Sequence, residues 1–156
     1  MSFAVDMKRL IEKRKSNLDQ VVRGTVIGML RGVDERSPVG NRELWAENID
    51  RASRGLPPLP AGYVGGRFRA NNILSINNQH TTTVDEPDPT GQRTMEENIA
   101  RIPQDAAGNV FYIVNNLAYA RPLEDGHSSQ APQGIYGLTA AEFQQYVDAA
   151  KAESRT

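Results

Sequence analysis

The stretch that decides the fold is "VDMKRLIEKRKSNLDQVVRGTVIGMLRGV", which runs from Val5 to Val33. Its apolar residues recur at spacings of three, four and seven, so they fall along one stripe of an α-helix. The residues of this stripe are Met7, Leu10, Ile11, Leu18, Val21, Val22, Thr25, Val26, Met29 and Val33. Such a helix extends for roughly 40 Å, which is long for a small domain. We therefore expect part of the stripe to lack a partner within the chain.

Three glycines, Gly24, Gly28 and Gly32, line one edge of this stripe at intervals of four residues. Each glycine weakens an isolated helix by about 1 kcal/mol relative to alanine, so the row predicts another backbone packed closely against it. The spacing matches the small-xxx-small pattern of membrane helices, but the charges of Arg23 and Arg31 exclude a membrane. We expect close packing within or between chains, and we expect the row to form one contact surface between copies.

The segments after this helix alternate between helix and loop signals. "SPVG" (Ser37 to Gly40) ends the long helix, as proline and glycine do. "NRELWAENIDRASRG" then predicts a second helix with Trp45, Ile49 and Ala52 on one face and Gly55 as its stop. The Pro/Gly-rich run from Leu56 to Gly66 predicts a loop without regular structure.

Strand signals follow in the second half of the chain. Ile73, Leu74 and Ile76 give one strand, and "NVFYIVNN" (Asn109 to Asn116) gives the strongest one. The β-branched residues of "TTTVDE" (81–86) predict a further strand.

Two capping boxes predict the starts of two more helices. Thr94 with Glu97 precedes a short helix, and Thr139 with Glu142 precedes a final helix that ends near Ala152. The apolar rows of these two helices are Met95, Ile99 and Ile102 in the first, and Phe143, Tyr146, Val147 and Ala150 in the second. Between them, Pro122 permits about one helical turn before it.

These elements predict an α+β fold in which a small antiparallel sheet packs against the long N-terminal helix, with several short helices and a C-terminal helix. We expect residues 1–156 to form one domain: the long helix over about 5–33, an inserted helix and loop over about 41–66, and the sheet with the C-terminal helix over about 67–152.

The composition bounds the function classes. The chain has 156 residues, 38% hydrophobic and 24% charged, and no apolar run long enough to span a bilayer. Charged residues enter early, so we expect no signal peptide. The chain contains no cysteine, so it has no disulfide and no thiolate metal site. A cytoplasmic protein follows as the expectation.

The charge balance disfavours nucleic-acid recognition. The formal net charge is −1, whereas nucleic-acid binders depend on a positive surface for phosphate contacts. One basic cluster near the N-terminus is interpreted as a solvated helix face. It contains Lys8, Arg9, Lys13, Arg14 and Lys15.

The stretch "LEDGHSSQAP" (Leu123 to Pro132) raises the possibility of a hydrolase, because Gly126, His127 and Ser128 match the start of the G-x-S-x-G nucleophile elbow. Gln130 occupies the position of the second glycine, and no histidine follows Ser128. Neighbouring side chains generally point apart, so His127 is a poor base for Ser128. A serine hydrolase is therefore disfavoured. A hydrolase that uses a carboxylate pair stays open because carboxylates are common in the chain, although no feature of the sequence selects a pair.

Metal and phosphate chemistry have little support. His80 and His127 are the chain's two histidines and lack the spacing of a zinc site. The acidic run Asp85, Glu86 and Asp88 lacks the ligand spacing of a calcium loop and is interpreted as a solvated turn. "GYVGGRF" does not match a phosphate loop. We expect no metal, no cofactor and no enzymatic turnover.

The segment "NNLAYARPLEDGHSSQAPQGIYGLT" (Asn115 to Thr139) resembles the C-terminal signature of the neck or tail-completion proteins of long-tailed double-stranded DNA bacteriophages and prophages. Ala118 stands where the family usually has proline. The residues that fill the pattern are Asn115, Asn116, Leu117, Tyr119, Leu123, Glu124, Gly126, His127, Ser128, Gln130, Ala131 and Pro132.

Further parts of the chain are similar to the same family. Ser37, Pro38 and Val39 begin a second motif that "GGRFRANNILSIN" (65–77) resumes, and residues 40–64 form an insertion between the two pieces. "DPTGQRTMEENI" (88–99) also resembles the family's turn before a short helix. The role of the insertion is left open.

The resemblance implies a structural virion protein that is assembled in the bacterial host cytoplasm and incorporated at the joint between head and tail. It implies a homo-oligomeric ring, for which the family suggests a hexamer, with tail-terminator, head-closure or connector proteins as partners, and neither membrane nor sequence-specific nucleic acid. A monomer that assembles only on its partner is the alternative. The glycine row is one expected surface. The loops at Arg67 to Asn72, which include Arg69, and at Glu124 to Pro132 are candidates for the other surface or for contact with adjacent neck proteins.

The short turn around Gly126 fits a structural role, with Pro132 stiffening its exit and Ser128 and Gln130 available for hydrogen bonds to backbone. We expect His127 to be a satisfied structural histidine. A small hydrolase and a host-directed binding module, such as a toxin–antitoxin partner, remain the alternatives.

Overall fold

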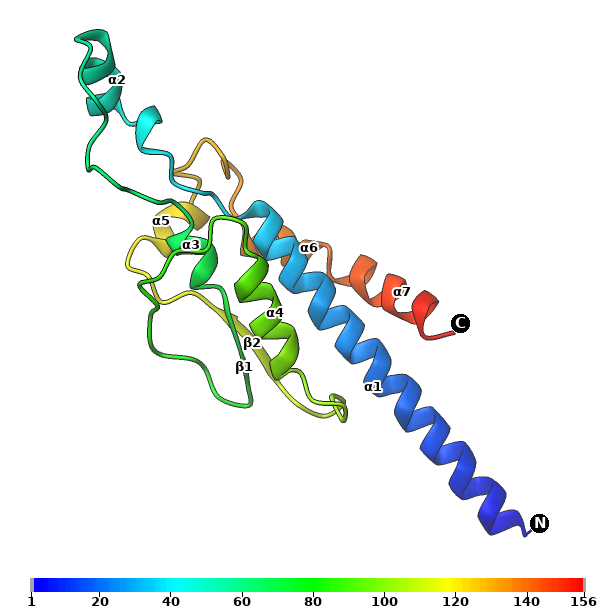
Figure 1. Ribbon diagram of the computed structural model, residues 1–156. Helices are drawn as coiled ribbons and strands as arrows, with labels where there is room; N and C mark the ends of the chain where they lie inside the picture. The colour runs from blue at the N-terminus through cyan, green and yellow to red at the C-terminus, as the bar shows by residue number, and fades with distance from the viewer. Residues whose placement is uncertain (1, 156) are drawn as a thin grey trace.

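Helix α1 (Phe3–Arg36) is the longest element of the molecule, and most of the other elements pack around its second half (Figure 1). The computed structural model describes residues 2–155 and has the α+β architecture that the sequence predicts. After α1, the elements in chain order are η1 (Arg42–Leu44), α2 (Ala46–Ser53), α3 (Arg67–Ala70), β1 (Ile73–Ile76), α4 (Gln92–Arg101), β2 (Phe111–Val114), α5 (Ala120–Glu124), α6 (Tyr136–Ala141) and α7 (Phe143–Glu153).

The sheet consists of β1 and β2 paired antiparallel. Leu74 lies opposite Ile113, and these two side chains face the same side because residues paired across a ladder share a face. They pack toward Val26 and Leu30 of α1 in a cluster closed by Ile102. The sheet is therefore small and gains its stability by burial against α1 and α4.

The strand predicted over residues 81–86 is wrong. This segment has no regular secondary structure and pairs with no strand of the described residues, and side-chain amides bond part of its backbone instead. The Asn71 amide donates to the Val84 carbonyl (2.8 Å) and accepts from the Val84 N–H (2.7 Å). Asn116 donates to the carbonyl of His80 at 2.9 Å. The buried Asn71 and the exposed Asn116 thus supply hydrogen bonds to this backbone that a strand ladder would otherwise make.

A second core cluster lies further along the same face of α1, near its C-terminal end. It joins Val33 to Phe68, Leu117 and Ile135, and it brings the 115–135 segment against α1. The tyrosine hydroxyl of Tyr136 donates to Asn72 at 2.6 Å beside this cluster. Two apolar clusters thus share the second half of α1.

The glycine row packs against α7 of the same chain. A methyl group added at Gly24 would lie 2.9 Å from the Cβ of Ala150, and one added at Gly28 would lie 2.9 Å from the Tyr146 ring. The prediction of close helix packing is confirmed. Because α7 covers the row, our expectation that it is a free surface between copies is wrong within this fold.

The first half of α1 has no such cover. Phe3 is 79% exposed and Ile11 is 61% exposed, although both belong to the apolar side of the helix. In Figure 1 this half extends away from the body to the N-terminus. The expectation that part of the stripe lacks a partner within the chain is confirmed for the described residues.

Both predicted capping boxes are wrong. Thr94 lies inside α4, whose first turn is capped by Asp88: its carboxylate accepts from the Thr94 N–H and hydroxyl, both at 2.8 Å. Thr139 lies inside α6 and donates to the Ile135 carbonyl at 2.9 Å. A buried carboxylate outside the helix satisfies the first-turn donors better than an internal Thr/Glu pair can.

Two other helix boundaries differ from prediction. The final helix is divided at Glu142 into α6 and α7, where Glu142 turns to meet Arg36. Pro122 lies within the first turn of α5 and does not follow it, because a proline's missing N–H is harmless there.

Candidate functional site

Residues 40–64 form an arm that extends from the body at the end opposite the N-terminus (Figure 1). The predicted helix over 41–55 is split into η1 and α2, because the Asn41 side chain caps a separate short turn by accepting from the Glu43 N–H at 3.0 Å. The predicted loop that follows has no helix or strand up to Gly66.

The arm is braced from within by Asn48, the buried residue of α2. Its side chain donates to the carbonyls of Arg42 and Leu59 (both 2.7 Å) and accepts from the Leu59 N–H at 2.9 Å. Arg51 donates to the Pro57 carbonyl at 2.9 Å. One polar residue thus ties both sides of the arm together.

The apolar face predicted for this helix is exposed to solvent. Ile49 is 57% exposed and Trp45 is 41% exposed, and the neighbouring Leu44 is 68% exposed. Trp45 stands edge-on to Tyr63 with ring centroids 5.0 Å apart, which holds the arm's base together. Sequence analysis did not identify the polar anchor Asn48, because the helical spacing that predicts this element considers apolar residues only.

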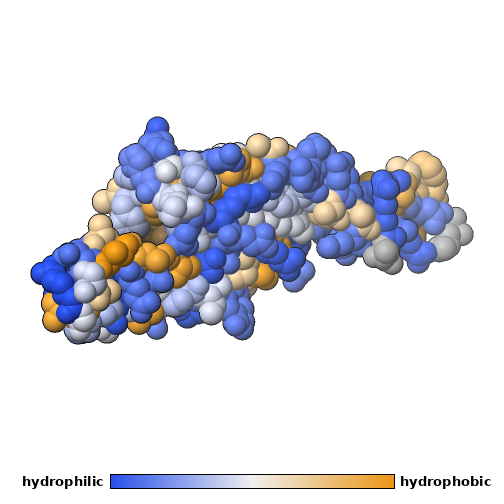
Figure 2. All heavy atoms as spheres, turned by 90° about the horizontal axis from the view of Figure 1, so that it is seen from above, coloured by the Kyte–Doolittle hydropathy of each residue, from blue (hydrophilic) through white to orange (hydrophobic). Residues whose placement is uncertain are grey.

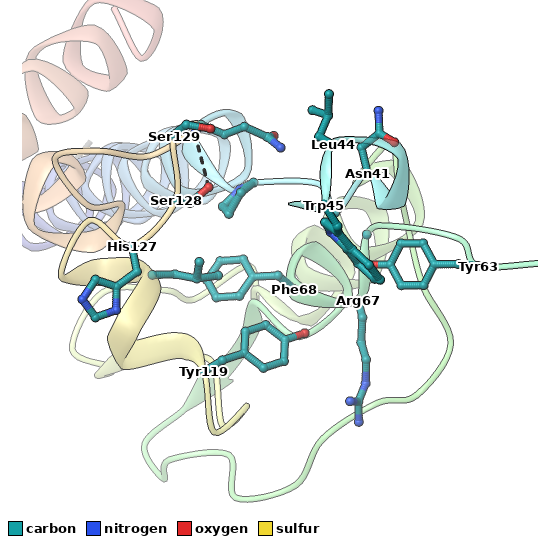
Figure 3. Close-up of a pocket in the computed structure, with 15 residues that line it drawn as sticks. Asn41, Leu44, Trp45, Tyr63, Arg67, Phe68, Tyr119, His127, Ser128 and Ser129 are labelled. Atoms are coloured by element: carbon teal, nitrogen blue, oxygen red, sulfur yellow. Dashed lines mark hydrogen bonds between the residues drawn. The ribbon is translucent and has the colours of Figure 1, made fainter. Parts of the chain in front are cut away.

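A groove of about 380 Å³ separates the base of the arm from α5 and the loop that follows it, over residues 119–130. Figure 3 shows Trp45 and Tyr63 from the arm side facing Phe68 and Tyr119 across it. Gln130 closes one wall, because its amide donates to the Val39 carbonyl at 2.9 Å and accepts from the Val39 N–H at 3.0 Å. The groove is aromatic and open to solvent, a shape suited to a protein side chain or peptide.

The side chains of the Asn-Asn pair in the predicted motif connect separate segments of the chain by hydrogen bonds. Asn115 donates to the Phe68 carbonyl and to the Asn72 side chain, each at 3.0 Å. Asn116 also reaches the Thr82 carbonyl. Tyr119 remains exposed at the groove. Partial burial raises the pKa of its hydroxyl, and this effect outweighs the positive charge of Arg67, which lowers the pKa.

Glu124 stabilises the chain internally, which corrects the prediction that it belongs to an interface with other proteins. Its carboxylate accepts from the backbone N–H groups of Ile135, Tyr136 and Gly137, each at 2.8 Å, at the start of α6. Burial alone would raise the pKa of Glu124, but these three donors outweigh it and hold the pKa below its ordinary value. The loop before α6 is thereby fixed.

The turn at Gly126 has the backbone conformation that the sequence predicted. Its φ is +85°, and a Cβ there would lie 2.5 Å from the Pro132 carbonyl oxygen. Both the positive φ and the close carbonyl exclude a side chain at position 126. Gly126 therefore allows the two ends of the loop to approach each other at Pro132.

Ser128 and His127 do not face each other. The Ser128 hydroxyl accepts from the Gln130 N–H at 3.2 Å, in a turn between the helices α5 and α6. His127 is exposed and points away from the serine in Figure 3, and its ring makes no hydrogen bond within residues 2–155. The expectation of a satisfied structural histidine is therefore wrong for the side chain; its backbone N–H donates to the Pro122 carbonyl at 3.1 Å.

The other histidine is engaged elsewhere. The His80 ring lies 3.0 Å from the Thr82 hydroxyl, and the His80 N–H donates to Ser75 at 3.1 Å. The described residues contain no cluster of histidine, aspartate and glutamate side chains that would hold a metal ion.

The second predicted interface, Arg67 to Asn72, is mostly structural. Residues Arg67–Ala70 form α3 and not a loop. Arg69 donates to the Pro89 carbonyl at 2.9 Å and to the Ser37 carbonyl at 3.3 Å, while Asn72 is buried. Arg67 alone remains exposed, at the groove, where it pairs with Asp85 at 2.7 Å.

The acidic run 85–88 is likewise used by the fold and is not simply a solvated turn. Asp88 is buried and caps α4. Burial works to raise the pKa of Asp88, yet the hydrogen bonds from Thr94 and Thr90 lower it on balance. Glu86 lies 3.6 Å from Arg93.

No helix in the described part of the chain is both long and apolar enough to cross a bilayer. No protein-family model matches the chain, no curated protein has significant sequence similarity to it, and no solved structure has a significantly similar fold. The resemblance to phage neck proteins therefore stays a prediction that depends on the motif residues alone.

Proposed function

We propose that this chain is a structural virion protein of the neck of a long-tailed bacteriophage, where it completes the tail and helps to join it to the DNA-filled head. The motif over residues 115–132 supports this proposal, because the side chains of Asn115, Glu124 and Gln130 hold backbone segments together. Tyr119, His127 and Ser129 remain at the groove surface for contact with other proteins.

The observation that carries the proposal is the location of the exposed apolar residues. Within residues 2–155, fifteen large apolar side chains are exposed; six belong to the first half of α1 and six to the arm. Those of α1 are Phe3, Val5, Met7, Leu10, Ile11 and Leu18, and those of the arm are Leu44, Trp45, Ile49, Leu56, Leu59 and Val64. Concentrated exposed apolar surface marks protein interaction sites.

These two surfaces lie at opposite ends of the elongated molecule (Figures 1 and 2). Figure 2 shows hydrophobic atoms at the molecular surface at both ends. Two different surfaces at opposite ends favour head-to-tail contacts, which close into a ring when the rotation between neighbours allows it. A neck ring is such an assembly, and the aromatic groove offers a third surface for a tail or connector protein.

The test is complementation of a phage or prophage from which this gene is deleted. We expect filled capsids and separate tails without the gene, and joined particles when the wild-type chain is supplied. Ser128→Ala should support joining, because the serine's role is a turn hydrogen bond. Deletion of residues 41–64 should not.

Normal tails on filled capsids in the absence of the gene would end this proposal. A covalent adduct on Ser128 from an active-site probe, combined with a hydrolytic activity that Ser128→Ala abolishes, would favour the hydrolase instead.

A further inference from the structure

We propose that the arm of one copy docks on the projecting half of α1 (Phe3–Leu18) of a second copy. The inference rests on the ring of the proposed function and specifies the two surfaces that form its repeated contact. A second copy is required, because the arm and the projecting half lie at opposite ends of one molecule (Figure 1).

The projecting half is an apolar helix side that the fold leaves open. Leu10, Ile11 and Leu18 are all exposed, and they continue the stripe that is buried further along the same helix. The arm presents Leu44 and Ile49 in the same way, on an element whose polar anchor Asn48 faces inward. Each surface is thus apolar and held in a fixed shape.

The charge of the projecting half selects its partner. Residues 1–18 contain five basic side chains and two acidic ones, Asp6 and Glu12, which gives +3. The whole chain carries 18 basic and 19 acidic residues, so residues 19–156 carry 13 basic and 17 acidic ones, or −4. Two projecting halves repel each other, whereas a projecting half and the rest of a second copy attract.

The arm carries three arginines and three carboxylates, so it is neutral overall, and its two carboxylates without an ion pair are what it offers to a basic surface. Its arginines are already occupied: Arg42 donates to the Pro60 carbonyl, Arg51 donates to the Pro57 carbonyl, and Arg54 pairs with Asp50. Glu43 and Glu47 form no ion pair within residues 2–155. These two carboxylates flank Leu44 and Trp45 in the chain, so acidic and apolar groups are presented together.

The projecting half has the complementary arrangement. Lys13 and Lys15 lie between Ile11 and Leu18 and form no ion pair within the same described range. Docking would bury the apolar residues of both surfaces while bringing these lysines opposite Glu43 and Glu47. Charges at the edge of such a contact set its pairing specificity.

A charge exchange tests this pairing on the purified full chain. One variant carries Lys13→Glu with Lys15→Glu, and the other carries Glu43→Lys with Glu47→Lys. Each variant alone should lose self-association by about tenfold or more, because like charges then face each other. An equimolar mixture should recover association, since each variant's arm then matches the other's helix. Light scattering measures all three samples.

The matched control carries Glu35→Lys with Glu96→Lys, two exposed acidic residues outside both surfaces. This variant changes net charge by the same amount as the arm variant and should associate like the wild type. Circular dichroism on every variant confirms that it is folded.

Site-specific crosslinking gives a second readout, because the chain contains no cysteine. A mixture of Ile11→Cys and Ile49→Cys chains should form a disulfide between copies on mild oxidation. A mixture of Ile11→Cys and Val110→Cys chains should not, although Val110 is 53% exposed and therefore as accessible as Ile49.

Three results would overturn the docking proposal. The first is a wild-type chain that stays monomeric up to about 1 mM, where even weak association is visible. The second is a folded mixture of charge-exchanged variants that does not associate. The third is binding of the projecting half to vesicles of anionic phospholipid without self-association, which would assign the basic helix to a membrane surface. If the charge-exchanged mixture recovers association but a phage without the gene still makes normal particles, the neck function is refuted and the contact between copies is retained.

Discussion

The two halves of α1 share one apolar stripe and one continuous helix, yet they differ in what covers them. The second half, from Val22 to Val33, contacts the sheet on one side and α7 on another. The first half carries Leu10 and Ile11 at equivalent helical positions and exposes them. Helical periodicity therefore identifies a face that needs a partner, but it does not say which chain supplies that partner.

The small residues mark the difference between the halves. Gly24, Gly28 and Gly32 occur only where α7 crosses α1 closely, whereas the projecting half has no glycine and carries the basic cluster. A row of small residues thus indicates a contact made within this fold. Lysine and arginine beside an apolar stripe indicate a surface that is in water while the chain is alone.

The largest expected effect comes from filling the close contact. Gly32→Leu should destabilise the chain by about 3 kcal/mol, because a Cβ at this position already collides with the Tyr146 hydroxyl and lies 3.1 Å from the Thr139 methyl group. The thermal midpoint should fall by roughly 10 °C. Thermal unfolding followed by circular dichroism measures the change.

Ser16→Leu is the matched substitution in the projecting half, where Ser16 is exposed. It should change stability by less than about 0.5 kcal/mol. Equal destabilisation by both substitutions would contradict the difference between the halves.

A smaller effect is expected from removing one charge in the packed region. Glu124→Gln should destabilise the chain by about 2 kcal/mol at pH 7, because a neutral amide cannot accept from the three N–H groups at the start of α6 as the carboxylate does. Glu12→Gln in the projecting half should leave the free energy of unfolding unchanged, since Glu12 makes an exposed pair with Lys8 at 4.0 Å.

The effect of Glu124→Gln depends on pH in a defined direction. The folded-state pKa of Glu124 lies below its unfolded value. Its ionised form therefore stabilises the fold fully above the unfolded pKa of about 4.3, and this contribution is lost as pH falls through the folded pKa. Urea unfolding at neutral and acidic pH should show the wild type and Glu124→Gln converging in acid. A difference that grows on acidification would contradict the assignment.

Much of the fold was predictable because it depends on apolar periodicity. The long helix, the two paired strands and the packing of the glycine row all follow from patterns that leave a chain few alternatives. The predicted strand at residues 81–86 and the capping box at Thr94 failed for one shared reason. Buried polar side chains, Asn71 and Asp88, supply hydrogen bonds from distant positions, and local patterns do not reveal them.

The candidate site was predictable only in part. The turn at Gly126 follows from local backbone requirements. The internal roles of Glu124 and Arg69 could not be predicted, because a charged residue is expected at the surface unless its backbone partners are known. The aromatic groove needed the structure, since Tyr63 and Tyr119 lie far apart in the chain.

The smallest expected effect is on stability after shortening the projecting half. Deletion of residues 2–8 should change the free energy of unfolding by less than about 0.5 kcal/mol, because Phe3, Val5 and Met7 are exposed and belong to neither core cluster. The slope of the free energy of unfolding against urea concentration should also stay constant, since little surface of this segment is buried. Yet the same deletion removes half of the exposed apolar residues of this surface, so association between copies should weaken in light scattering. Loss of stability in the shortened chain would place part of the core in this helix segment, and the contrast between the halves of α1 would then fail.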